Sequence, residues 1–162
     1  MGLGYDLHRL VAGGPLRIGG VDIPYGFRCA GHSDADVLLH AVTDALLGAA
    51  ALGDIGEMFP DTDPANRGRD SAEMLRQAWQ RVASAGWQIS NLDCVVLLEA
   101  PRLAPHRQRI RQRLGEILDL QPAQIGLKAK TGEGVDAVGR QQAIAALCVA
   151  LLVPQAAESS LD

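Results

Sequence analysis

Residues 32–64 read HSDADVLLHAVTDALLGAAALGDIGEMFPDTDP, an apolar stretch between two polar segments. Its apolar residues recur at the spacing of one helix face, at Val37, Leu38, Ala41, Ala45 and Leu46. Ser33 or Asp34 can cap the start of this helix. Asp36 falls in its first turn, where the helix dipole favours an anion, and Gly53 can end it. The stretch therefore predicts one helix with a buried face.

Strands are predicted on both sides of this helix. Residues 1–10, MGLGYDLHRL, alternate loosely, and the Gly-Gly pair within PLRIGGVDIP (residues 15–24) is typical of a two-residue hairpin. Residues 88–100, QISNLDCVVLLEA, are typical of a strand, and a short helix or turn followed by a strand is expected over residues 122–130. The apolar segment at residues 139–154 fits either a helix or a strand, because periodicity cannot distinguish them there.

Two further helices complete the pattern, at residues 70–87 and, amphipathic and basic, at residues 105–120. The order of elements predicts an α/β or α+β fold, with a single mixed β-sheet covered by helices on one side. No linker or repeat divides the chain. Residues 1–154 are therefore expected to form a single domain, followed by a frayed polar tail at residues 155–162.

Composition restricts the classes of partner. The chain has 162 residues, a formal net charge of −4 and no basic run, which argues against a nucleic-acid partner. Its longest apolar run, residues 143–153, is too short to cross a bilayer, so no membrane partner is expected. The cysteines, Cys29, Cys94 and Cys148, form no C-x-x-C pair and are typical of a reduced, cytoplasmic protein. An anionic substrate would then need metals or a few well-placed cations.

The first predicted strand carries a possible metal site. Asp6 and His8 are two residues apart, so their side chains point to one face of a strand. With His40 they form a set of two imidazoles and one carboxylate, which suits catalytic zinc with an open fourth position, and also non-haem Fe(II). Asp36 or Asp44, one turn from His40, can hold its other ring nitrogen. The alternative is a surface Asp-x-His and a helical histidine that bind no metal.

Three other segments have polar groups suited to an anionic or hydroxylated ligand. The HSD segment (residues 32–34) suits an anion, or serves only as a helix cap. The carboxylates of residues 54–63 suit sugar hydroxyls or a divalent cation, or only cap local turns. KAKTGEG (residues 128–134) has Lys and Thr for phosphate oxygens and Glu for a hard metal, or is a solvated strand end.

Four segments occur in one order along nearly the whole chain: GYDLH (residues 4–8), AGHSDADVLLHAVTDALLGAAALGDIGEMFPDTDP (30–64), EAPRLAPH (99–106) and KAKTGEGVDAVGR (128–140). In this combination the chain resembles the family of 2-C-methyl-D-erythritol 2,4-cyclodiphosphate synthases of non-mevalonate isoprenoid biosynthesis. The resemblance implies a phosphorus–oxygen lyase that assembles as a homotrimer, with sheets around a central axis and active sites between subunits. It also implies a strand for the last segment.

The resemblance implies a substrate and a reaction as well. The substrate would be 4-diphosphocytidyl-2-C-methyl-D-erythritol 2-phosphate, whose 2-phosphate attacks the β-phosphate in line to give the cyclic diphosphate and CMP. Metals and hydrogen-bond donors would offset the repulsion between the anionic groups, with no protein nucleophile. Zinc would be held by Asp6, His8 and His40, and Mg²⁺ or Mn²⁺ would lie on the diphosphate near Glu133. His32 and Thr131 match positions that stabilise the transition state.

The substrate contacts that the resemblance implies are Asp6, Leu7, His8, His32, Ser33, Asp54, Ile55, Gly56, Phe59, Pro60, Asp61, Thr62, Asp63, Leu98, Glu99, Ala100, Pro101, Arg102, Leu103, Ala104, Lys130, Thr131, Gly132, Glu133, Ala137 and Arg140. Asp61 is expected on the erythritol hydroxyls. The stretch 98–104 is expected to bind cytosine, largely through its backbone, and residues 130–133 to bind the diphosphate.

Two departures from the family pattern are visible. Gln141-Gln142 stands where many relatives have Gly-Glu, and Ala137 stands where many have an aromatic residue. Both lie near the trimer cavity that is proposed in the family to bind isoprenoid diphosphates, so such binding is in doubt for this chain. Two other function classes are compatible with the same metal set: a non-haem iron oxygenase, and a non-catalytic trimeric binding module with a structural zinc.

Overall fold

A computed structural model of the chain describes residues 1–155. Its strands are β1 (Gly2–Ala12), β2 (Leu16–Ile18), β3 (Val21–Ile23), β4 (Phe27–Ala30), β5 (Trp87–Leu97), β6 (Ile125–Lys130) and β7 (Ala143–Pro154). Its helices are α1 (Val37–Ala49), α2 (Ile55–Met58), α3 (Ser71–Ser84), α4 (Arg107–Leu118) and α5 (Asp136–Gly139), with 3₁₀ turns at Pro64–Asn66, Ala104–His106 and Pro122–Gln124.

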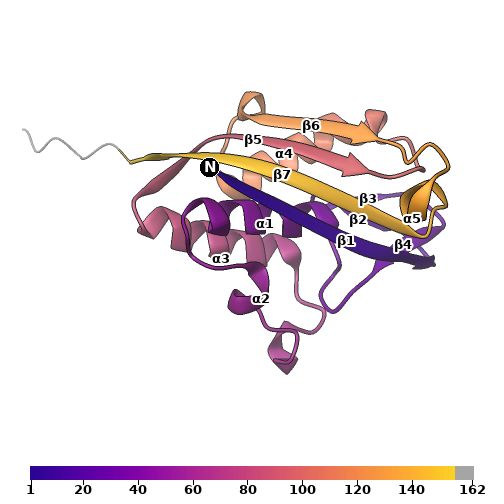
Figure 1. The fold of residues 1–162 in the computed structure, drawn as a ribbon, viewed down its shortest axis with the longest axis horizontal. Helices are drawn as coiled ribbons and strands as arrows, with labels where there is room; N and C mark the ends of the chain where they lie inside the picture. Colours follow the sequence, from indigo (N-terminus) through magenta and orange to yellow (C-terminus); the bar gives the residue numbers. More distant parts are fainter. Residues whose placement is uncertain (156–162) are drawn as a thin grey trace, which may run out of the picture.

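One five-stranded sheet organises the molecule, in the order β4-β1-β7-β5-β6 (Figure 1). β1 and β5 each pair antiparallel with β7, whereas β5 and β6 pair in parallel. Figure 1 shows α1, α3 and α4 behind the sheet, all on one face, and the hairpin β2–β3 forms a separate small sheet. The predicted single mixed sheet with helices on one side is confirmed.

Two glycines of β1 bring the sheet close to α1. A Cβ at Gly4 would lie 1.9 Å from the carbonyl oxygen of Ala41, and one at Gly2 would lie 2.2 Å from that of Ala45. Only glycine fits such a close approach of strand backbone to helix backbone. Because side chains in a strand alternate, Asp6 and His8 point to the same face as these glycines, toward α1.

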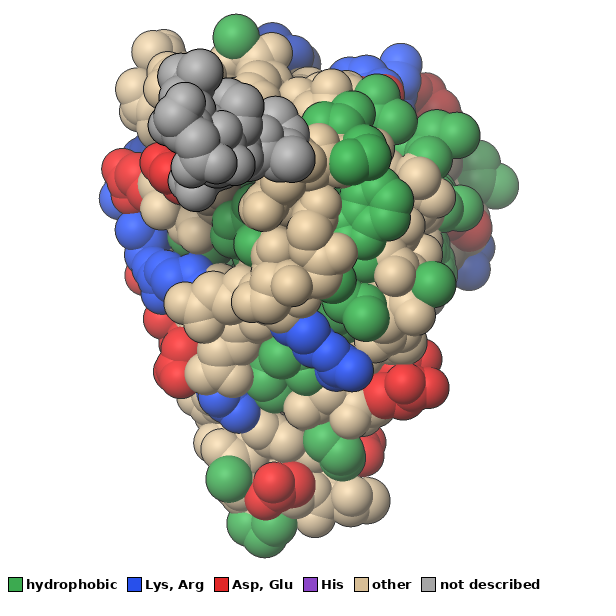
Figure 2. Space-filling view, turned by 90° about the vertical axis from the view of Figure 1, so that its left-hand side faces the viewer, with side chains coloured by type: hydrophobic (Ala, Val, Ile, Leu, Met, Phe, Trp, Pro, Cys, Tyr) green, Lys and Arg blue, Asp and Glu red, His purple; other side chains and the backbone are tan. Residues whose placement is uncertain are grey.

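The last apolar segment is strand β7, as the resemblance implied. Its alternate residues Ile144, Ala146, Cys148, Ala150 and Leu152 are buried beneath the helices. The opposite face of the sheet is different, because several of its apolar side chains are exposed: Leu3, Tyr5, Leu7, Val149, Leu151 and Val153. Figure 2 shows hydrophobic side chains gathered on its right, the side toward which this outer face points.

The predicted caps of the first helix are wrong at both ends. The N-cap is Asp36, not Ser33 or Asp34, and its Oδ1 accepts from the Leu39 N–H at 3.1 Å. The helix ends at Ala49, before Gly53. The fully buried Asp36 carboxylate has a second task, since it also accepts the N–H groups of the hairpin residues Gly19 and Gly20 at 2.8 and 2.7 Å and so joins β2–β3 to α1.

The hairpin at Gly19-Gly20 is confirmed: both residues have positive φ, as the favoured two-residue turns of antiparallel pairs require. Strand β4 and the short helices α2 and α5 were not predicted. The predicted tail at residues 155–162 lies outside the described residues except for Gln155, whose N–H donates to the Gly86 carbonyl at 2.8 Å. Within residues 1–155, no helix is long and apolar enough to span a membrane.

Candidate metal centre and substrate pocket

The structure brings Asp6, His8 and His40 together, and we call these three residues the metal side of the site. Asp6 Oδ2 lies 3.0 Å from His8 Nδ1 and 3.0 Å from His40 Nδ1. One ligand atom from each residue lies within 4.8 Å of the others. β1 supplies two of the groups and the first turns of α1 supply the third, at the point where Gly2 and Gly4 let strand and helix approach.

The charges of the metal side are strongly coupled. Burial disfavours the ionised form of Asp6, yet the adjacent His40 and His8 rings hold the pKa of this carboxyl well below its usual value. Burial likewise disfavours the charged form of His40, but its hydrogen bond with Asp6 and the charge of that carboxylate raise the pKa of His40. The site therefore stabilises an anionic carboxylate that faces imidazole nitrogens.

The donor set fits a divalent metal ion. Among residues 1–155, the buried His8 Nδ1 has no aligned hydrogen-bond partner, although Asp6 Oδ2 is only 3.0 Å away. The other Asp6 oxygen accepts the Leu7 N–H at 2.9 Å, which leaves Oδ2 to face the two rings. Two imidazole nitrogens and one carboxylate oxygen are ligands of catalytic metals, and three protein ligands leave a position open for substrate.

The far nitrogen of His40 has partners other than those expected. His40 Nε2 lies 2.8 Å from Ser71 Oγ and 3.1 Å from Ser33 Oγ. The expectation that Asp36 or Asp44 holds this nitrogen is therefore wrong. Asp36 is used by backbone N–H groups, and Asp44 accepts the Ile55 N–H at 2.8 Å, where it fixes the start of α2.

A pocket of about 360 Å³ opens beside the metal side. It is lined by His8, His32, Ser33, His40, Ile55, Gly56, Phe59, Pro60, Asp61, Asn66 and Met74. The residues of this lining that sequence reasoning missed are Asn66 and Met74. Asn66 is 5% exposed and donates through Nδ2 to the Pro60 carbonyl at 2.8 Å, so it holds the 59–63 loop in place. A lone Asn in a polar loop gave no signal of this role.

Local capping shapes the loop that closes this pocket. Asp54 caps α2 by accepting the Glu57 N–H at 2.8 Å, and Asp63 accepts the Ala65 N–H at 2.9 Å at the next 3₁₀ turn. The guanidinium of Arg69 lies 4.8 Å from the centre of the Phe59 ring. Asp61 and Thr62 are exposed between these fixed points. Asp54 and Asp63 therefore cap local turns, which was the alternative to ligand binding for this segment, whereas Asp61 lines the pocket.

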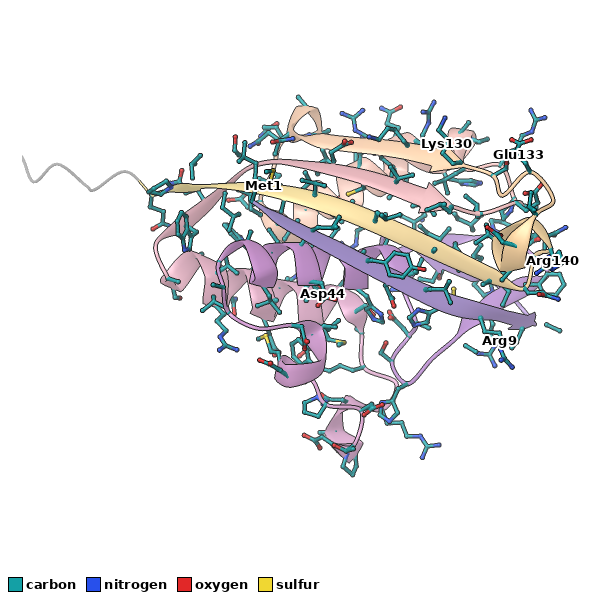
Figure 3. All side chains as sticks on the ribbon, viewed as in Figure 1. Met1, Arg9, Asp44, Lys130, Glu133 and Arg140 are labelled. Carbon is teal, nitrogen blue, oxygen red and sulfur yellow. The ribbon has the colours of Figure 1, made fainter. Side chains whose placement is uncertain are left out.

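Lys130, Thr131 and Glu133 lie elsewhere, and we call them the phosphate side. Figure 3 shows Lys130 and Glu133 at the end of β6, across the sheet from Asp44 of α1. Thr131 Oγ1 donates to Glu133 Oε1 at 2.8 Å. The expected cytosine stretch, residues 98–104, adjoins them, because the Gly132 N–H donates to Glu99 Oε2 at 3.0 Å.

The two sides do not meet within one chain. β7 and β5 separate β1 from β6, which places these strands about 14 Å apart at ordinary strand spacing. No residue of the phosphate side lines the pocket beside the metal side. Leu7 and Ala137 instead line another hollow, of about 680 Å³, together with Gln141 and Gln142. Gln141 accepts there from the Tyr25 hydroxyl at 2.7 Å.

Comparison with known proteins supports the resemblance. Residues 1–153 match the YgbB family. A 2-C-methyl-D-erythritol 2,4-cyclodiphosphate synthase from Rhodopirellula baltica is 57% identical over 152 residues, which are 94% of this chain and 92% of that protein.

Solved structures agree with this match. The CDP-bound form of a 2C-methyl-D-erythritol-2,4-cyclodiphosphate synthase is 42% identical, with a TM-score of 0.87 over 94% of this chain and 99% of that one. The bifunctional IspDF from Campylobacter jejuni is 39% identical, with a TM-score of 0.90 over 93% of this chain and 41% of that one, so this chain spans less than half of that protein. The chain therefore belongs to the YgbB family, the family of the 2-C-methyl-D-erythritol 2,4-cyclodiphosphate synthases.

Proposed function

We propose that this protein converts 4-diphosphocytidyl-2-C-methyl-D-erythritol 2-phosphate to 2-C-methyl-D-erythritol 2,4-cyclodiphosphate and CMP, as a phosphorus–oxygen lyase of isoprenoid biosynthesis. The observation that carries the proposal is the metal side itself: Asp6, His8 and His40 converge at the wall of a pocket, in a chain whose relatives bear the name of this enzyme. Residues 1–154 form the catalytic domain in this proposal. Its three free, buried cysteines are consistent with the reduced cytoplasm.

The reaction needs placement and charge neutralisation rather than a protein nucleophile. An oxygen of the 2-phosphate forms a bond to the β-phosphorus, and the bond from that phosphorus to the bridging oxygen breaks, so that CMP leaves with the electron pair. Zn²⁺ held by Asp6, His8 and His40 would supply positive charge to phosphate oxygens that approach each other. A second cation, Mg²⁺ or Mn²⁺, would neutralise the diphosphate near Glu133.

The residues around the pocket have matching tasks in this proposal. His32 and Thr131 donate to the oxygens that gain charge in the transition state. Ser33 and the loops at residues 54–56 and 59–63 bind the erythritol phosphate, with Asp61 on its hydroxyls. The stretch 98–104 holds cytosine, and residues 130–133 contact the diphosphate. Ala137 and Arg140 are further contact positions near the trimer axis.

A homotrimer explains how the two sides form one site. β1, which holds Asp6 and His8, lies about 14 Å across the sheet from β6, which ends at Lys130. The outer face of the sheet is apolar and exposed, with Leu3 65%, Tyr5 54% and Leu151 41% exposed, as expected of a face that is covered by other copies. In the trimer the phosphate side of one subunit would complete the metal side of the next.

The test is release of CMP from the cytidine substrate. The purified chain is expected to release CMP only with divalent metal, and His8→Ala is expected to lose at least about a thousandfold in rate, since a metal contributes several kcal/mol to such a barrier. His106→Ala, a change to a histidine outside the pocket lining, is the matched control and keeps the wild-type rate. Normal CMP release from His8→Ala verified to be free of metal would refute the proposal.

Metal analysis distinguishes the other two function classes. Zinc in protein purified without added metal supports the lyase. Oxygen-dependent turnover with bound iron would instead indicate a non-haem iron oxygenase. A protein that holds zinc but shows no saturable binding of CDP or CMP would be a binding module with a structural metal.

A further inference from the structure

A chain of hydrogen bonds continues from His40 away from the pocket. Ser71, the first residue of α3, is 1% exposed, and its Oγ lies 2.8 Å from His40 Nε2. The Ser71 hydroxyl donates in turn to Oδ1 of Asp34. Neither residue belongs to the expected substrate or metal contacts, and neither lines the pocket beside the metal side. The Ser71 hydroxyl reaches the site through the His40 ring.

Asp34 is itself held in place. Its backbone N–H donates to the Arg69 carbonyl at 3.1 Å. Its second oxygen, Oδ2, lies 3.2 Å from Arg17 Nε, a buried nitrogen for which residues 1–155 offer an ion pair but no hydrogen bond. Arg17 in turn donates to Asp22 Oδ1 at 3.0 Å, within the β2–β3 hairpin. The carboxylate therefore has an ionic partner on one oxygen and the Ser71 hydroxyl on the other.

This arrangement sets the direction of each proton. An ionised carboxylate only accepts, so the Ser71 hydroxyl proton must point to Asp34. The lone pairs of Ser71 Oγ then face His40, and Nε2 can make its 2.8 Å contact only as an N–H donor. With its proton on Nε2, the neutral ring keeps a free lone pair on Nδ1, the nitrogen that lies 3.0 Å from Asp6 Oδ2.

We infer that Ser71 and Asp34 are a positioning pair, which holds His40 with its proton on Nε2 and so presents Nδ1 as a metal ligand. The inference rests on the proposed function, because it assumes that His40 binds metal. Partners behind a ligating histidine fix its tautomer and ring orientation, and losing them typically costs about 10- to 100-fold in metal affinity.

Ser33 offers a comparison at the same nitrogen. Its Oγ lies 3.1 Å from His40 Nε2, but it also accepts the Ala35 N–H at 3.2 Å, and Asp34 does not receive its proton. Ser33 lines the pocket, whereas Ser71 does not. No carboxylate of residues 1–155 thus fixes the Ser33 hydroxyl proton. Ser33 therefore determines the tautomer of His40 less strongly than Ser71 does.

The experiment measures zinc affinity of the full chain by chelator competition, together with the absorption spectrum of the Co²⁺-loaded protein. Ser71→Ala is expected to weaken zinc binding about tenfold or more and to change the Co²⁺ spectrum. Asp34→Asn is expected to weaken it at least as much. In this variant Arg17 would hold the amide oxygen, and the amide NH₂ would donate to Ser71 Oγ. The Ser71 hydroxyl proton would then point to His40 Nε2 instead of residue 34. Ser33→Ala is expected to have a smaller effect.

Asp70→Ala is the matched control for the stability of α3. Asp70 caps the same helix by accepting the Ala72 N–H at 2.9 Å and does not contact His40, so this variant loses stability but keeps the zinc affinity. Zinc affinity within twofold of wild type in both Ser71→Ala and Asp34→Asn would overturn the inference, as would an equal loss in Asp70→Ala. Failure of the wild-type chain to bind zinc would refute the proposed function instead.

Discussion

Asp6, His8 and His40 are partly buried and joined by side-chain contacts, whereas Lys130 and Glu133 stand exposed at the end of β6. The metal side is fixed by two elements in close contact, β1 and α1, and by partners behind His40. The phosphate side lies in a turn, where Glu133 and Gly134 both have positive φ. Within residues 1–155, no hydrogen bond or ion pair of the Lys130 side chain is found.

In the proposed function, this difference corresponds to two different tasks of the two sides. A metal ligand set must be held in place before the ion arrives, because its geometry determines the affinity. Groups that bind a flexible diphosphate through long-range charge need less fixed positions, and a lysine contributes a point charge on a flexible stem. The two sides should therefore respond differently to the same kind of substitution.

The largest expected effect is the recovery of CMP release when an intact metal side and an intact phosphate side lie on different subunits of one trimer. His8→Ala removes one side and Glu133→Ala the other, so each variant alone is expected to be nearly inactive in CMP release. In trimers assembled at random from equal amounts of both, about a quarter of the interfaces would pair an intact metal side with an intact phosphate side. Activity should therefore rise to about a quarter of the wild-type value on co-refolding.

The control for this experiment is the same mixture without refolding, in which subunits have not exchanged and activity stays low. A co-refolded mixture that forms mixed trimers and yet remains inactive would contradict a site shared between subunits. Mass measurement of the assembled protein verifies that mixed trimers are present.

Gly4 tests how the metal side is built. Gly4→Ala places a Cβ 1.9 Å from the Ala41 carbonyl oxygen, so strand and helix must separate. We expect the free energy of unfolding to fall by about 3 kcal/mol and zinc binding to weaken. Gly48→Ala, in α1, is the matched control, because a Cβ there meets nothing within 4 Å, and it should raise stability by about 0.5–1 kcal/mol. Denaturant unfolding measures the stability of both variants. Equal free energies of unfolding would contradict the close approach of β1 to α1.

The Asp6–His40 pair predicts a pH dependence of the metal-free protein. The pKa of Asp6 is lowered, so its contribution to stability is present above its usual pKa of 3.8 and is lost as pH falls toward the lowered value. The pKa of His40 is raised, so its contribution is complete below 6.5 and is lost as pH rises through the raised value. The free energy of unfolding of the wild type should exceed that of His40→Gln by about 2 kcal/mol at pH 5.5, the contribution of a charge-assisted hydrogen bond. At pH 9 the difference should be smaller. A difference that does not change between the two pH values in urea unfolding would contradict the pairing.

Much of the fold follows from short-range patterns in the sequence. The period of residues 37–46 predicted α1, the Gly-Gly pair predicted the β2–β3 hairpin, and the D-x-H spacing placed Asp6 and His8 on one face. Strand β4, in contrast, is four residues with no alternation, and it exists because it pairs with the end of β1. The segment that became β7 was too apolar for its period to separate helix from strand, and only the family resemblance assigned it.

The site shows the same limit. Sequence spacing could pair residues one or two turns apart, so Asp36 and Asp44 were the obvious partners for the second nitrogen of His40. The shorter contact is with Ser71, which is 31 residues away and reaches His40 because α3 packs beside α1. Local spacing therefore placed Asp6 and His8 together, whereas His40, 34 residues from Asp6, and the groups that orient His40 come together through tertiary packing.

The smallest expected effect concerns Lys130, and it sharpens the comparison between the two sides. Because its side chain is exposed and its contacts are with solvent, Lys130→Ala should change the free energy of unfolding by no more than about 0.5 kcal/mol. Affinity for CDP, measured by calorimetry, should nevertheless fall severalfold and become less sensitive to salt, since a cation near the diphosphate is lost. Arg113→Ala removes the same charge from α4, where Arg113 pairs with Glu116, and should leave CDP affinity unchanged. An equal loss of affinity in both variants would mean that only the net charge matters, and that the phosphate side has no fixed position for the ligand.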